Sequence, residues 1–223
     1  MNYPSSELVW RKIALNKLDF NKKLEGKMKL TIAHQESYSR GELLLRTFFG
    51  GIYIGIPHGF LMMFVGIWYA IQAFLTFWAV LFTGNFPENF FNFQVKYLSW
   101  VTRLQASLTN LVDGYPAIGV SGTSEVVNLE VERPEKVNQG LVILRALFGW
   151  AYVMIPHMFC LYFRMIGTGF LMFLAWWAVL FTGNYPEKWH AFNVGTFRWY
   201  LRVMLYYGFF TDDYPPFSGK EEA

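Results

Sequence analysis

The sequence contains little charge and almost no cysteine. Only 16% of its 223 residues are Asp, Glu, Lys or Arg, whereas an average soluble domain contains roughly 25%. Much of the molecular surface is therefore expected to face something other than water. The single cysteine, Cys160, excludes an intramolecular disulfide, and because it lies within an apolar stretch we interpret it as an apolar packing residue.

The sequence also lacks the motifs that usually carry enzyme chemistry. It contains no phosphate-binding glycine loop, no zinc-type spacing of Cys and His, no nucleophile elbow and no His-Glu-x-x-His motif. Its long apolar stretches contain no carboxylate, which disfavours a proton-coupled pump or transporter. We therefore predict a protein without enzymatic activity or a metal site. Its many aromatic residues suit membrane interfaces rather than nucleic acid.

What the sequence does contain is one stretch that occurs twice. The eleven residues from Trp78 to Glu88 return from Trp177 to Glu187 with ten identities, at an offset of 99. The same offset aligns most of the chain without a gap, and such repetition fixes the architecture. We predict two tandem pseudo-symmetric repeats, 28–118 and 126–218, with a linker at 119–125 and an acidic tail at 219–223.

The apolar residues are concentrated in two blocks, Leu43–Phe82 and Leu141–Phe181. Each block is about forty residues long, and one bilayer crossing needs roughly twenty. We therefore expect an all-α integral membrane protein with a transmembrane helical hairpin in each repeat, four spans in all. The turns are expected near 65–66 and 164–167, since an Arg such as Arg164 costs several kcal/mol at mid-bilayer.

Glycine and proline mark the expected bends and ends of these helices. A proline near the middle of the first span of each repeat is expected to kink it. Glycine and asparagine suit a left-handed helix end, and a proline suits the start of the next helix. These positions are Pro57, Pro156, Gly84, Asn85, Pro87, Gly183, Asn184 and Pro186.

The third helix of each repeat is amphipathic, and its position decides the topology. Helices that lie in the membrane interface leave the two repeats parallel, which we favour, whereas spanning helices make the repeats inverted.

Met28, Leu30 and Ile32 alternate with polar residues, and the pattern recurs 99 residues later. This alternation predicts one short strand per repeat, paired into a minor β ribbon.

We expect residues 1–27 to form a basic amino-terminal segment ahead of the first repeat. Residues 1–40 contain eight Lys and Arg against four acids, a net charge of +4 ahead of the first apolar block. The positive-inside rule therefore predicts a cytoplasmic amino terminus. Within it, Ser5 and Ser6 are suited to cap a short amphipathic helix through Leu24.

The order of the motifs resembles a bacterial integral-membrane family known as domain of unknown function 4389. The second repeat carries the fuller set: Pro156-His157, Phe181-Thr182-Gly183-Asn184-Tyr185-Pro186, Arg198-Trp199, Arg202 and Asp213-Tyr214-Pro215-Pro216-Phe217. The first repeat departs from it, for example at Phe86 and Ser99. The resemblance covers roughly 41–217 and implies a bacterial membrane protein, but it implies no reaction.

Two sets of residues are candidates for a binding site. His58 and His157 follow the two prolines, and facing imidazoles can hold a haem iron; alternatively they bond to carbonyls freed by the prolines. Four arginines near the cytoplasmic side suit lipid phosphate, or alternatively pair internally, for example with Asp113 and Asp212. These are Arg46, Arg145, Arg103 and Arg202.

Three functions remain open at this point. The leading prediction is a non-catalytic accessory or scaffolding subunit of a bacterial inner-membrane complex. Its expected partners are membrane lipids together with other membrane-protein subunits or further copies of itself. The alternatives are a lipid-binding or lipid-moving protein that uses the four arginines, and a small b-type haem protein that uses His58 and His157.

Overall fold

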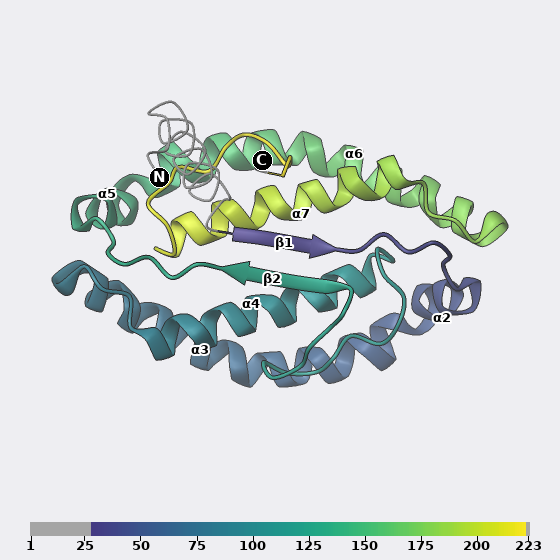
Figure 1. Ribbon diagram of the computed structural model, residues 1–223, viewed down its shortest axis with the longest axis horizontal. Coiled ribbons are helices and arrows are strands. Elements are labelled where there is room, and N and C mark those ends of the chain that lie inside the picture. Colours follow the sequence, from purple (N-terminus) through teal and green to yellow (C-terminus); the bar gives the residue numbers. More distant parts are fainter. Residues whose placement is uncertain (1–27, 222–223) are drawn as a thin grey trace, which may run out of the picture.

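The computed structural model describes residues 28–221, which form a mostly helical slab with one small sheet (Figure 1). The predicted basic segment 1–27, with its amphipathic helix, lies outside the described residues. So do the last two residues of the acidic tail.

The described chain consists of two repeated halves. The first contains β1 (Met28–Ile32), α2 (Arg40–Gly50), the π-helical turn η1 (Gly51–Gly55), α3 (Ile56–Thr83) and α4 (Glu88–Leu108). The second contains β2 (Val127–Val131), α5 (Gln139–Gly149), η2 (Trp150–Met154), α6 (Ile155–Thr182) and α7 (Glu187–Tyr207). Every element of the second half lies 99 residues after its counterpart in the first half. The predicted tandem repeats are therefore confirmed.

The predicted helical hairpins are wrong. In each repeat the apolar block forms one continuous helix of 44 residues, Arg40–Thr83 and Gln139–Thr182. No turn occurs at 65–66 or at 164–167. Glycines such as Gly66, Gly167 and Gly169 weaken a helix without ending it, and neither block has a proline or a run of polar residues at its centre. The described residues therefore contain two helices long and apolar enough to cross a membrane, where four were predicted.

Each long helix contains a π-helical turn directly before its proline. Pro57 and Pro156 are the second residues of α3 and α6, just after η1 and η2. Proline has no N–H to donate to the preceding turn, and a π-helical turn absorbs that interruption without ending the helix. The chain changes direction here, between α2 and α3 and between α5 and α6 (Figure 1).

The predicted helix ends are confirmed. Gly84 and Gly183 adopt φ angles of +68° and +76°, and their N–H groups donate to the carbonyls of Val80 and Val179 at 2.8 Å. A left-handed conformation costs a residue with a Cβ atom, so glycine suits both positions. Pro87 and Pro186 stand one residue before α4 and α7. Asn85 and Asn184 lie in the same turns.

The two strands form the predicted ribbon, and its register shows the symmetry of the molecule. β1 and β2 are antiparallel, with Leu30 paired to Leu129, its own counterpart in the other repeat. A pseudo-two-fold axis therefore passes between these two residues. It exchanges α3 with α6 and α2 with α5 in the view of Figure 1. Both repeats therefore turn the same side toward each broad face of the slab, so they are parallel and not inverted.

Reciprocal contacts close the two repeats around this axis. The N–H of Tyr38 donates to the carbonyl of Gly183, and that of Val137 donates to the carbonyl of Gly84, both at 2.8 Å. The start of each long helix contacts the end of the other, α2 against α6 and α5 against α3. The repeats are therefore one folded unit.

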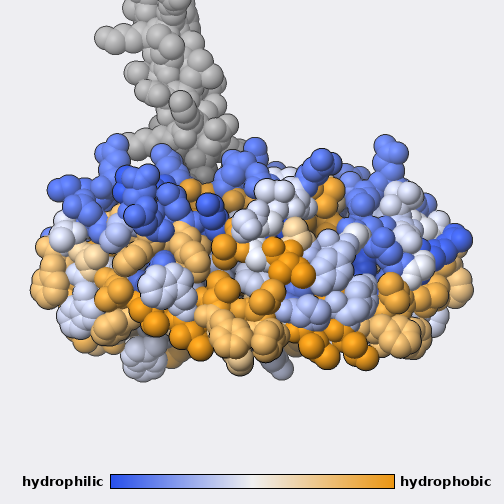
Figure 2. Space-filling model, turned by 90° about the horizontal axis from the view of Figure 1, so that it is seen from below, coloured by the Kyte–Doolittle hydropathy of each residue, from blue (hydrophilic) through white to orange (hydrophobic). Residues whose placement is uncertain are grey.

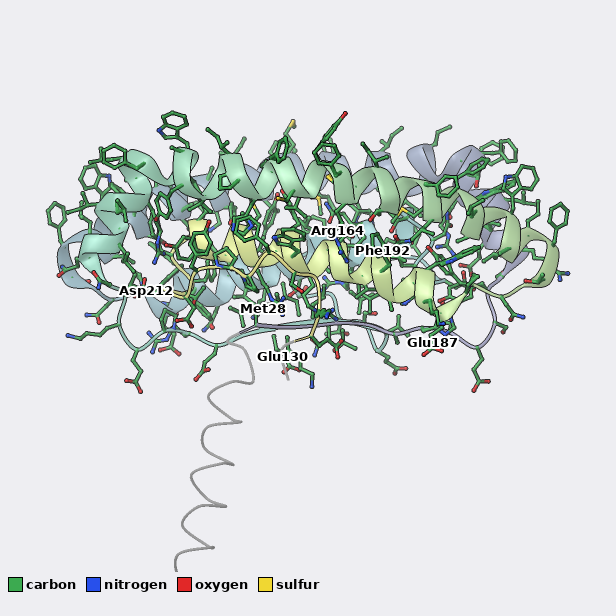
Figure 3. All side chains as sticks on the ribbon, turned by 90° about the horizontal axis from the view of Figure 1, so that it is seen from above. Met28, Glu130, Arg164, Glu187, Phe192 and Asp212 are labelled. Carbon is green, nitrogen blue, oxygen red and sulfur yellow. The ribbon has the colours of Figure 1, made fainter. Side chains whose placement is uncertain are left out.

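The slab has one polar and one apolar broad face (Figure 2). The β ribbon lies on the polar face, the long helices form the apolar face, and α4 and α7 pack between them (Figures 1 and 3). Of the 39 exposed large hydrophobic side chains, 32 belong to the two long helices. The predicted amphipathic third helices, α4 and α7, are therefore inner helices that support the apolar face.

Candidate functional site

Arg46 lies at the start of the first long helix and is used for internal contacts. Its Nη1 donates to the carbonyls of Ser107 and Val112, at 3.0 and 2.6 Å. Its Nη2 forms ion pairs of 2.8 Å with both Asp113 and Glu42. The side chain is almost fully buried, so these contacts fasten α2 to the end of α4.

Arg145 repeats this arrangement in the second half. It donates to the carbonyls of Tyr206 and Thr211, at 2.9 and 3.0 Å, and pairs with Asp212 at 2.5 Å. Leu141 stands where the first repeat has Glu42, so Arg145 has one carboxylate fewer. Its guanidinium instead lies 4.1 Å above the ring of Tyr206.

Arg103 and Arg202 also make internal contacts. Arg103 donates to the carbonyl of Gly119 at 2.9 Å, and Arg202 donates to that of Ser218 at 3.2 Å. Both side chains fasten an inner helix to the segment that follows it. Lipid binding by the four predicted arginines stays a prediction, because their described contacts point into the protein.

The two predicted haem ligands are not brought together. α3 and α6, which carry His58 and His157 near their starts, begin at opposite ends of the slab (Figure 1). Each Nδ1 accepts a hydrogen bond of 2.9 Å from a tryptophan of its own repeat, Trp100 or Trp199. A neutral imidazole whose Nδ1 accepts carries its proton on Nε2, which then has no lone pair for iron.

These histidines are instead centres of aromatic packing. Both are completely buried, and Tyr115 and Tyr214 lie against them with centroid distances of 5.5 and 5.3 Å. In the second repeat Phe217 also stacks on His157 at 4.0 Å. Each proline-histidine motif therefore anchors the segment that follows the inner helix.

A polar cleft lies beside α7, lined mostly by residues of the second repeat. It has a volume of about 790 Å³ and opens between α6, α7, β1 and the chain after Phe217. Its lining includes four cations and two carboxylates, together with His34 and His190: Arg164, Lys188, Arg198, Lys220, Glu187 and Glu221. We call this region the α7 cleft.

Arg164 reaches into the α7 cleft from the middle of the long helix α6. Its Nε donates to Thr196 Oγ1 at 2.9 Å and its Nη2 donates to the carbonyl of Phe192 at 3.1 Å. The guanidinium lies 4.2 Å above the ring of Phe192 (Figure 3). Thr168 contacts Thr196 at 2.8 Å and completes this polar cluster.

Arg198 lies on the floor of the cleft. It donates to the carbonyls of Gly219 and Leu30, at 2.9 and 3.3 Å, and pairs with Glu221 at 2.6 Å. Burial lowers the pKa of Arg198 from its ordinary value, and the charge of Glu221 partly opposes that shift. The Arg198 side chain is 8% exposed and that of Glu221 is 79% exposed, so this ion pair reaches from the floor of the cleft to solvent.

Sequence reasoning missed this cleft because Arg164 was interpreted as the marker of a turn. A signal was present in the repeat alignment. The four cations of the cleft, Arg164, Lys188, Arg198 and Lys220, correspond to Val65, Asn89, Ser99 and Ser121 in the first repeat. A position-by-position comparison of charge between the repeats would have identified the cluster.

Comparison with known proteins gives one match. The family described as "Domain of unknown function (DUF4389)" matches residues 43–118 and again residues 142–219. No curated protein and no solved structure matches the chain.

Proposed function

The chain belongs to the DUF4389 family as two tandem copies, and we propose that it is a non-catalytic scaffold seated in one leaflet of the bacterial inner membrane. In this arrangement both long helices lie parallel to the membrane plane. The apolar face enters the hydrocarbon and the polar face with its β ribbon remains in water on the cytoplasmic side.

The observation that carries this proposal is the separation of the slab into two broad faces. The exposed side of the long helices is apolar along its whole length, from Leu44 to Phe82 and from Ile143 to Phe181. Between 47 and 83 the chain contains no Asp, Glu, Lys or Arg, and between 146 and 182 it contains only Arg164. Such a surface is unfavourable in water, because apolar area costs roughly 25 cal/mol per Å² when exposed.

Helix length favours a seat parallel to the membrane over a crossing. The chain changes direction at η1, so α3 is the straight part of the first long helix. At about 1.5 Å per residue, its exposed apolar stretch from Ile56 to Phe82 is about 39 Å long. The hydrocarbon core of a bilayer is about 30 Å thick. If α3 stood upright, roughly a quarter of this stretch would lie outside the hydrocarbon, together with the exposed apolar residues of α2.

The position of the β ribbon supports the same orientation. The ribbon lies near the middle of the slab's long axis (Figure 1) and exposes Lys29, Asn128 and Glu130. If the long axis crossed the bilayer, these polar side chains would lie near its centre, where charge is strongly unfavourable. With the long axis in the membrane plane, the whole ribbon lies in water.

The proposed scaffold role rests on the polar face, which would remain outside the membrane. The polar face presents a ribbon and two symmetry-related sets of helix ends on one folded unit, and the basic segment 1–27 precedes β1 in the sequence. Such a surface suits another protein subunit, which the leaflet seat would hold at the membrane.

The test is the composition of the particle extracted gently from native membranes. We expect a stoichiometric complex with at least one other protein, and we expect it to persist through size-exclusion chromatography. A particle that contains only copies of this 26.1 kDa chain contradicts the scaffold role. An absorption spectrum of the same preparation tests the haem alternative, for which the enclosed histidines give no structural support.

A further inference from the structure

The two repeats have diverged in charge around one cleft. Four cations gather beside α7, and their counterparts in the first repeat are all neutral. The positions of Thr168 and Thr196 are occupied in the first repeat by Tyr69 and Tyr97, whose rings stack at 4.7 Å. The first repeat therefore fills with aromatic rings the place where the second repeat holds a guanidinium and two hydroxyl groups.

The fold itself does not require Arg164. The first repeat builds the same long helix with Val65 at this position. Among residues 28–221 no carboxylate forms an ion pair with Arg164, whereas Arg46 has two such partners and Arg145 and Arg198 have one each. Arg164 is held by the Phe192 carbonyl, the Thr196 hydroxyl and the Phe192 ring, none of which carries a negative charge. Its positive charge is therefore available to an anionic ligand.

The wall of the cleft is also specific to the second repeat. The chain after Phe217 crosses α7 at Gly195, so closely that a Cβ atom on Gly219 would overlap with the Gly195 carbonyl oxygen. That Cβ atom would also lie 2.8 Å from Arg164 Nη2. The first repeat has Lys96 and Val120 at these positions, so it cannot form the same crossing.

The cleft lies at the boundary between the two faces of the slab. Arg164 comes from the helix that forms the apolar face, while Glu187 lies near the polar edge (Figure 3). Lys188 and Lys220 are exposed at its mouth. If the slab is seated in one leaflet as proposed above, this boundary lies at the level of the lipid phosphates.

We propose that the α7 cleft binds a phosphate group, presented by the headgroup of an anionic phospholipid. Arg164 and Arg198 contact it from within, since guanidinium donors match phosphate oxygens, and Lys188 and Lys220 add charge at the mouth. In the unliganded protein the exposed carboxylate of Glu221 forms an ion pair with Arg198. The phosphate displaces this carboxylate when it binds. The assignment of the phosphate to a lipid headgroup rests on the proposed position of the slab in one leaflet. The assignment of a phosphate site to the cleft does not depend on that position.

The experiment measures lipid retained by the full chain in detergent, by native mass spectrometry during titration with phosphatidylglycerol. The variant Arg164→Val with Lys188→Asn carries the residues of the first repeat. We expect it to bind at least about tenfold more weakly, since each charge-assisted hydrogen bond contributes enough for such a change. Glu221→Gln is expected to bind more tightly than the unchanged protein.

A matched control removes the same charge elsewhere. Lys96 and Lys136 are exposed lysines outside the cleft, and we expect Lys96→Asn with Lys136→Asn to retain phosphatidylglycerol. A second cleft variant, Lys188→Asn with Lys220→Ser, changes only exposed side chains and keeps Arg164 in place. It guards against misfolding, and we expect it to bind severalfold more weakly.

Two further titrations, with inorganic phosphate and with glycerol 3-phosphate, identify the source of the phosphate. Binding of phosphatidylglycerol alone supports a lipid headgroup. Binding of the soluble compounds with the same dependence on Arg164 supports the phosphate site but overturns the lipid assignment. Equal retention by the cleft variants and the unchanged protein overturns the proposal, and so does an equal loss in the control. Because the measurement is made in detergent, its outcome does not depend on how the slab sits in a membrane.

Discussion

At the scale of single residues, the fold depends on polar pairs that recur once in each repeat. Arg46 and Arg145 each contact two carbonyls and an aspartate at the end of the inner helix. The same aspartates accept the backbone N–H of the residue that caps the long helix, Ser39 or Asn138. One side chain therefore holds together a helix start and a helix end.

The two pairs differ in a way that predicts different stabilities. Asp212→Asn leaves Arg145 buried without a carboxylate, and breaking such a pair costs about 3–5 kcal/mol. Asp113→Asn leaves Arg46 with Glu42, so the loss is expected to be smaller, on the order of 1 kcal/mol. Thermal unfolding in detergent, followed by tryptophan fluorescence, measures both.

The control for this comparison is the variant that lacks both carboxylates in the first repeat. Asp113→Asn with Glu42→Leu reproduces the second repeat after Asp212→Asn, and we expect it to lose about as much stability. An equal loss from the two single aspartate variants would contradict the role given to Glu42.

Some of these pairs were accessible from the sequence and others were not. The pairing of Arg46 with Asp113 could be anticipated, because both residues recur at the same offset and opposite charges in an apolar setting attract strongly. The bond from Trp100 to His58 could not be anticipated. It depends on the side-by-side packing of two helices in a hairpin that no local pattern specifies.

At the scale of helices and strands, local sequence signals predicted the helix ends and the two strands correctly. They did not predict that each apolar block forms one long helix. The glycine at a left-handed helix end and the alternation in a strand act over a few residues. Whether forty apolar residues form one helix or two depends on whether the helix must fit the bilayer thickness. The sequence pattern is the same in both cases, so the hairpin prediction relied on an assumed orientation.

The glycine helix ends give a prediction at this scale. Gly183→Ala places a Cβ atom on a residue with φ of +76°, which costs about 1–2 kcal/mol. Gly59→Ala lies inside α3, where no atom lies within 4 Å of the new Cβ atom, and alanine favours a helix. We expect the first variant to lower the unfolding temperature and the second to leave it unchanged or raise it. Equal effects would show that the left-handed end is not what constrains Gly183.

At the scale of the whole molecule, duplication has produced a symmetric frame with one asymmetric cleft. The pseudo-two-fold axis between Leu30 and Leu129 gives both repeats the same apolar and polar sides. Such symmetry suits a slab that lies on one side of a membrane. The α7 cleft departs from it, because only the second repeat has Arg164 and its neighbouring cations.

The orientation of the long helices is the central claim, and single cysteines at the two ends of one helix test it directly. After Cys160→Ala, Ser37→Cys and Asn85→Cys place one thiol beyond each end of the helix Arg40–Thr83, at exposed positions. A membrane-impermeant maleimide is applied to inside-out and right-side-out vesicles. A helix parallel to the membrane predicts that both cysteines react in inside-out vesicles and neither in right-side-out vesicles. Reaction of the two cysteines from opposite sides would show that the helix crosses the bilayer, and would contradict the leaflet seat.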